Sequence, residues 1–161
     1  MKNLEIYIHI PFCVRKCEYC DFLSFPADDD AKLRYVKGLM AEMIFYGPLM
    51  KNYQVSSVYI GGGTPSSIDE QWTAALMEGV FDCFNVLPDA EISIECNPGT
   101  LSREKLLAYR DAGINRLSIG LQSANNDELK LLGRIHTFEQ FVTNYEVARN
   151  VGFKNINVDL M

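Results

Sequence analysis

The chain has 161 residues, 48% of them hydrophobic, which is enough to bury one sizeable core and predicts a single domain. Its 15 basic and 21 acidic residues give a net charge of −6 without any lysine- or arginine-rich run, so we expect no nucleic-acid partner. No apolar run is long enough for a membrane-spanning helix and no signal-peptide core is present, which predicts no integral membrane segment and a cytoplasmic location.

Short apolar strands alternate with amphipathic helices along the whole chain. In chain order we expect strand 4–10, helix 31–46, strand 57–60, helix 69–84, strand 91–96, helix 102–112, strand 116–119, helices 126–132 and 137–150, and strand 155–161. This alternation predicts an α/β fold in which helices cover a parallel sheet. With right-handed crossovers the sheet is either barrel-like or doubly wound, and periodicity alone leaves both open.

The final strand ends on apolar residues, Leu160 and Met161. A natural domain rarely leaves so hydrophobic an edge uncovered. We therefore expect the chain to be part of a longer protein.

Three of the five cysteines fall within eight residues, just after the first strand, as C-x3-C-x2-C: Cys13, Cys17 and Cys20. In a cytosolic chain such a cluster indicates metal binding or redox chemistry rather than disulfides. Ligand sites in parallel α/β folds gather at the carboxyl ends of strands, where this loop would lie. Three thiolates can each hold one iron of a cubane cluster, and the fourth iron then stays open for a substrate or cofactor.

The alternative is a zinc site in which His9 completes a Cys3His ligand set, which zinc accepts. Two features count against it: His9 falls within a predicted strand rather than in a knuckle, and zinc ribbons usually supply two separate ligand pairs. A zinc-stabilised α/β binding module remains the remote alternative.

The C-x3-C-x2-C spacing with Tyr19 before the last cysteine resembles the signature of the radical S-adenosylmethionine (SAM) superfamily. The resemblance to one branch, the oxygen-independent coproporphyrinogen III oxidase family and its haem-chaperone relatives, extends along essentially the whole chain: YIHIPFC at 7–13, CEYC at 17–20, GGGTPS at 61–66, ECNPGT at 95–100, GINRLSIGLQS at 113–123, LGRIHT at 132–137 and VDLM at 158–161. It implies a partial (β/α)6 TIM-like barrel truncated after the fifth strand. Residues 1–161 would form the N-terminal part of the radical SAM core domain, without the sixth strand or the C-terminal domain.

The resemblance implies two cofactors: a [4Fe–4S] cluster on the three cysteines, and SAM, which chelates the open iron and is cleaved reductively to a 5′-deoxyadenosyl radical. The residues it assigns to SAM are Tyr7, Tyr19, Gly62, Gly63, Thr64, Glu95, Gln122, Arg134 and Asp159. Tyr19 would pack on the adenine and Arg134 would make a forked contact with the SAM carboxylate. Taken singly, each residue is more often a core aromatic, a tight turn, a surface group or a helix cap. Glu95, Gln122 and Asp159, however, fall at the ends of successive strands, which predicts one shared rim. His136 has no expected role.

Within this family we expect a haem chaperone, with haem and haem-acceptor proteins as partners beside an electron donor. The oxidase subgroup carries a further cysteine two positions after the third, where this chain has Phe22, and a longer segment before the first strand. The alternative is the oxidase itself, which decarboxylates propionates of coproporphyrinogen III to vinyl groups.

Overall fold

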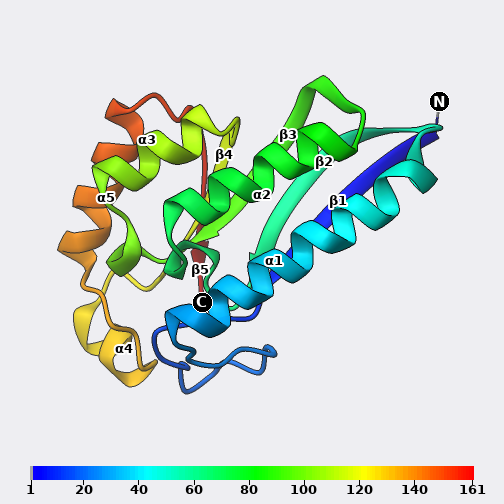
Figure 1. Cartoon of the computed structure of the whole chain (residues 1–161). Coiled ribbons are helices and arrows are strands. Elements are labelled where there is room, and N and C mark those ends of the chain that lie inside the picture. The colour runs from blue at the N-terminus through cyan, green and yellow to red at the C-terminus, as the bar shows by residue number, and fades with distance from the viewer. Residues whose placement is uncertain (1) are drawn as a thin grey trace.

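The computed structural model describes residues 2–161 and contains one five-stranded sheet with helices between its strands (Figure 1). The elements in chain order are β1 (Lys2–Ile10), α1 (Asp29–Tyr46), β2 (Tyr53–Gly62), α2 (Glu70–Cys83), β3 (Val86–Cys96), α3 (Arg103–Asp111), β4 (Arg116–Gln122), α4 (Asn126–Leu131), α5 (Phe138–Asn150) and β5 (Asn155–Leu160). Short 3-10 turns lie at Gly47–Met50, Pro65–Ser67 and Pro98–Thr100.

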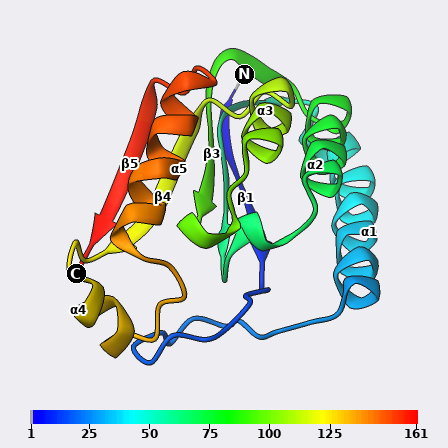
Figure 2. The same ribbon diagram turned by 90° about the vertical axis from the view of Figure 1, so that its left-hand side faces the viewer.

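The strands are all parallel and their spatial order, β1-β2-β3-β4-β5, follows the chain. A doubly wound sheet would reverse its strand order at a switch point, and this sheet does not. Right-handed crossovers between neighbouring strands place the connecting helices on the same face, and Figure 2 shows them in a row along that side. The α/β prediction is confirmed, and the open sheet is a partial TIM-like barrel.

Two strands are longer than their sequence pattern predicts. β2 begins at Tyr53 and β3 at Val86, four and five residues earlier than expected. The first residues of β2 are recruited by pairing with β1, in the register Lys2↔Tyr53, and β3 contains Pro88, which interrupts the apolar pattern. Both strands also shift register near Val55, where periodicity is lost.

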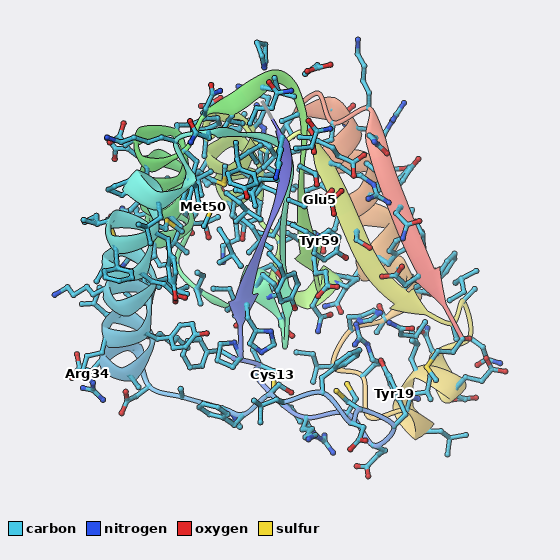
Figure 3. The ribbon with its side chains drawn as sticks, turned by 90° about the vertical axis from the view of Figure 1, so that its right-hand side faces the viewer. Glu5, Cys13, Tyr19, Arg34, Met50 and Tyr59 are labelled. Atoms are coloured by element: carbon cyan, nitrogen blue, oxygen red, sulfur yellow. The ribbon has the colours of Figure 1, made fainter. Side chains whose placement is uncertain are left out.

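Side chains alternate between the two faces of the sheet. The helix-covered face is apolar: Ile10, Ile60, Ile94, Leu117 and Ile119 are each at most 1% exposed and pack in the core with side chains of α2 and α3. Fully burying one such side chain contributes about 1.5–3 kcal/mol. The opposite face carries polar side chains, among them Glu5 and Tyr59, which are labelled in Figure 3.

The strands all end at one edge of the sheet. Figure 2 shows the long loop after β1 crossing this edge, with α4 and the end of β5 beside it. The predicted site residues fall at or near this edge. Within residues 2–161, every helix is too short or too polar to cross a membrane.

Candidate functional site

A cavity of about 380 Å³ opens at the carboxyl edge of the sheet. Its lining contains every site residue predicted from the sequence except Tyr7: Cys13, Cys17, Tyr19, Cys20, Gly62, Gly63, Thr64, Glu95, Gln122, Arg134 and Asp159. These residues come from the loop after β1, the ends of β2 to β5 and the turn after α4. Parallel folds place ligand sites at this edge because loops from several strands converge there.

Tyr7 lies on the polar face of β1, outside the cavity lining, with 59% of its surface exposed. Its hydroxyl is hydrogen-bonded to Nδ1 of His9 at 3.1 Å, and its ring stacks on Tyr59 with the centroids 6.2 Å apart. Tyr7 therefore lies beside the cavity rather than in its lining: an added Cβ at Gly61 would stand 3.0 Å from Cε2 of Tyr7 and 3.2 Å from Oε2 of Glu95.

The cysteine loop (residues 11–28) is anchored at its base to the end of β1. The Cys13 amide donates to the Phe25 carbonyl at 3.2 Å, and the Phe25 amide donates to the Pro11 carbonyl at 3.0 Å. Phe12, 2% exposed, packs edge-on against Phe25 and Tyr35. This anchor holds Cys13 at the end of β1, where Figure 3 labels it, while Cys17 and Cys20 are half-buried further along the loop.

The arrangement of the cysteines bears on which group they hold. All three thiols are free and line the same cavity, yet no three His, Cys, Asp or Glu side chains within residues 2–161 converge as ligands of a single metal ion. A zinc site requires its ligands around one ion, whereas a cubane binds each thiolate through a different iron. The three thiols on one cavity wall fit a [4Fe–4S] cluster, whereas His9, the fourth ligand of the zinc alternative, is not among the residues that line the cavity.

The glycine segment (residues 61–64), which includes the end of β2, supports the cysteine loop. The amides of Gly63 and Thr64 donate to the carbonyls of Ile10 and Phe12, at 2.9 and 2.7 Å. The amide of Gly62 donates to Oε2 of Glu95 at 3.0 Å. Since all three amides have partners inside the protein, the segment offers a ligand its carbonyls and its lack of side chains rather than free N–H groups.

Two carboxylates lie on the cavity wall and are oriented by neighbours. Glu95 accepts from the Tyr59 hydroxyl at 2.9 Å and from the Gly62 amide, and burial together with this carboxylate raises the pKa of Tyr59. Asp159 accepts from Ser118 at 3.1 Å and from Asn157 at 2.6 Å. A carboxylate oxygen has two lone pairs, so both groups can still accept from ligand hydroxyls.

The end of β4 has an unusual backbone that two side chains hold in place. Gln122 has φ of +72°, a left-handed conformation that is uncommon for a residue other than glycine. Before it, the carbonyl of Gly120 accepts from Arg134 Nη2 at 2.7 Å and that of Leu121 accepts from His136 Nε2 at 3.2 Å. His136, which has no role expected from the sequence, thus helps to direct Gln122 into the cavity.

His136 is 3% exposed, and burial together with the nearby Arg134 guanidinium lowers its pKa to about 4. The ring is therefore neutral at pH 7, with the proton on the nitrogen that donates to Leu121.

Acid should destabilise the fold through this buried imidazole. With a pKa of 6.5 when unfolded and about 4 when folded, His136 binds its proton more readily in the unfolded chain, so stability falls as the pH drops through this range. Between pH 7 and pH 5 we expect a loss of about 2 kcal/mol that the His136→Gln variant does not show. Urea unfolding of the unaltered protein and of His136→Gln at the two pH values measures this loss of stability. An equal loss in the two proteins would show that His136 is not its source.

Sequence reasoning missed Asn97 and Ser118, which line the cavity and hydrogen-bond to Arg134 and Asp159. It also missed Tyr59, which donates to Glu95, and His136, which donates to the carbonyl of Leu121. Ser118 carries a detectable signal because it pairs with Glu95 across the sheet, and Tyr59 because it pairs with Ser93, which shares the face of Glu95 on β3. Asn97 and His136 lie in loops, where no such periodicity exists.

Comparison with known proteins agrees with this geometry. The pattern of the radical SAM superfamily matches residues 7–161. Relatives include the protein named "Heme chaperone HemW" of Escherichia coli K12, 39% identical over 98% of this chain and 42% of the relative, and its namesake in Bacillus subtilis 168, 39% identical over 96% and 41%. This chain therefore spans about two-fifths of the length of these relatives.

Among solved structures, the radical SAM enzyme coproporphyrinogen III oxidase (HemN) from Escherichia coli superimposes with a TM-score of 0.91 at 32% identity, over 99% of this chain and 37% of that one. The hydrogenase maturase HydG shares the fold, with a TM-score of 0.63 at 10% identity. With its superfamily pattern, its sheet and its three-cysteine cavity in agreement, the chain belongs to the radical SAM superfamily.

Proposed function

We propose that residues 2–161 form the cofactor-binding part of a radical SAM haem chaperone. The observation that carries this proposal is a single cavity that joins three cysteines to the ends of four further strands and to the turn after α4. Cys13, Cys17 and Cys20 would hold the [4Fe–4S] cluster, which supplies the electron for reductive cleavage of SAM when both are bound.

The remaining cavity residues would bind SAM. Glu95 and Asp159 are placed to accept hydrogen bonds from its hydroxyl or cationic groups, and Gln122 can both donate and accept. Tyr19 offers an aromatic face to the adenine, while Gly62 and Gly63 allow the ligand to approach the backbone closely. Tyr7 would contact SAM from the polar face of the sheet, where its ring and Glu95 both lie close to Gly61.

The haem-chaperone assignment is supported by the relatives that bear this name and by Phe22. Phe22 lines the cavity and is 68% exposed at the position where the oxidase subgroup carries its extra cysteine. An aromatic side chain in this position cannot supply a thiolate to chemistry beside the cluster. The partners would then be haem, a haem-acceptor protein and an electron donor.

The second candidate is the oxygen-independent oxidase, which would act on coproporphyrinogen III. It is favoured by the close superposition on the Escherichia coli oxidase over almost the whole chain. The shared barrel does not separate the two, because a fold hosts more than one function.

The test is anaerobic reconstitution of the whole protein with iron and sulfide, followed by SAM and dithionite. We expect a brown protein that releases 5′-deoxyadenosine and binds haem stably without decarboxylating coproporphyrinogen III. Formation of the vinyl product would establish the oxidase in its place. A protein that assembles no cluster and retains zinc would contradict both candidates.

A further inference from the structure

The turn after α4 packs directly on the part of the cysteine loop that carries Cys17. The amide of Glu18 donates to the carbonyl of Leu132 at 3.2 Å. Gly133, with φ of +74°, lies so close that an added Cβ would stand 3.3 Å from the Glu18 amide nitrogen and 3.6 Å from Cα of Cys17. Figure 2 shows α4 and this loop side by side at the carboxyl edge of the sheet.

Arg134 follows this turn and its guanidinium contacts both sides of the cavity. Nη1 lies 3.7 Å from Sγ of Cys17 and 3.4 Å from the hydroxyl of Tyr19, both on the cysteine loop. Nη2 donates to the carbonyl of Gly120 at 2.7 Å and to Oδ1 of Asn97 at 3.1 Å, at the ends of β4 and β3. One side chain therefore joins the loop to two strands of the sheet.

The partners of Arg134 in these contacts are all groups of the protein. Both terminal nitrogens of Arg134 are engaged, and of its three side-chain nitrogens only the buried Nε has no partner among residues 2–161. A forked contact with the SAM carboxylate would therefore compete with the bonds to the loop or to the strands. The bonds to Cys17 and Tyr19 are a separate role from SAM binding.

The contact with Cys17 places a permanent positive charge and an N–H donor beside a cluster ligand. Such charge-assisted hydrogen bonds are the stronger ones, and a half-buried site screens them less than water does. Hydrogen bonds to cluster sulfurs and nearby charge are among the factors that set the potential of an iron–sulfur cluster. A cation beside Cys17 favours the reduced cluster, which carries one more negative charge.

We propose that Arg134 is a positioning residue that ties the cysteine loop to the ends of β3 and β4 and raises the reduction potential of the cluster. The second half of this proposal rests on the proposed cluster-binding function. The first half concerns the chain without cofactors.

The positioning role of Arg134 is tested by trypsin digestion of the whole protein prepared without iron. Cleavage of the peptide bonds after Arg15 and Lys16 is followed by mass spectrometry. In Arg134→Gln, cleavage at these bonds should rise several-fold because the open loop is more populated. Arg149→Gln is the matched control: Arg149 also donates to two carbonyls, of Phe153 and Lys154 at 3.2 and 2.8 Å, but lies away from the cavity. Equal cleavage in Arg134→Gln, Arg149→Gln and the unaltered protein overturns the positioning role of Arg134.

The effect on the cluster is tested by redox titration of the reconstituted protein in the absence of SAM, with the reduced cluster followed by electron paramagnetic resonance. In Arg134→Gln the ratio of reduced to oxidised cluster at a fixed potential should fall about tenfold, equivalent to a shift of about 59 mV to more negative values. Arg134→Lys, which keeps the charge, should recover most of this shift, whereas Arg149→Gln should show none. An unchanged potential in Arg134→Gln overturns the electrostatic role. If the unaltered protein assembles no cluster, the proposed function fails, and the trypsin experiment still tests whether Arg134 positions the cysteine loop.

Discussion

Replacement of Cys17 with alanine is expected to abolish the iron–sulfur cluster while leaving the fold intact. Reconstituted wild-type protein should contain about four irons per chain, whereas Cys17→Ala should retain at most about a tenth of this amount and lose its brown absorbance. In the proposed function three thiolates hold the cluster, and only two then remain, while the half-buried methyl group disturbs little of the core. Iron and sulfide analysis with visible absorbance spectra measures the effect.

Cys83→Ala is the matched control. Cys83 is also a free, half-buried cysteine, but it lies at the end of α2, where it packs against the core and outside the cavity lining. The Cys83→Ala protein should bind as much iron as the unaltered protein and give the same circular dichroism spectrum as Cys17→Ala. A full iron content in Cys17→Ala, or its loss in Cys83→Ala, would show that the cluster is held elsewhere.

The rim of the site could be predicted from the sequence because strand ends are marked by changes in hydrophobic pattern. Glu95 follows the buried Ile94, and Asp159 follows Val158, so each carboxylate falls at the end of its strand. Parallel strands then bring these ends to one edge whatever the details of packing. This explains why residues more than sixty positions apart line one cavity.

The contacts within the site could not be predicted in the same way. Arg134 and Cys17 are 117 positions apart and meet only because the turn after α4 packs on the cysteine loop. Such loop-to-loop contacts leave no periodic signal. Tyr7 lies on β1, three residues before the strand ends, so its predicted contact with SAM rests on its place in the motif and not on a strand end.

The backbone conformation at Gly62, in the glycine segment, requires a glycine. Gly62 has φ of +123°, outside the regions that L-residues with a side chain favour. A Cβ at Gly62 would lie 2.8 Å from the carbonyl oxygen of Ile10 and 2.8 Å from Cε1 of His9. Because the first of these atoms belongs to the backbone of β1, a larger residue must move the strand that carries the cysteine loop.

Gly62→Ala should therefore lower the free energy of unfolding by about 2–4 kcal/mol, through backbone strain of roughly 1–3 kcal/mol and the cost of moving β1. Gly38→Ala is expected to act in the opposite direction. Gly38 lies in α1 with nothing within 4 Å of an added Cβ, so alanine should stabilise the helix by about 0.5–1 kcal/mol. Urea unfolding of the two variants beside the unaltered protein measures both signs.

The same substitution tests whether the glycine segment supports the site as well as the fold. Displacement of β1 would shift Cys13, and strain at Gly62 would disturb the amide that orients Glu95. We expect Gly62→Ala to assemble less cluster and bind SAM more weakly even below its unfolding transition, where Gly38→Ala matches the unaltered protein. A Gly62→Ala protein of normal stability and iron content would show that alanine is accommodated here, and that the close approach of β1 and β2 does not hold the cysteine loop in place.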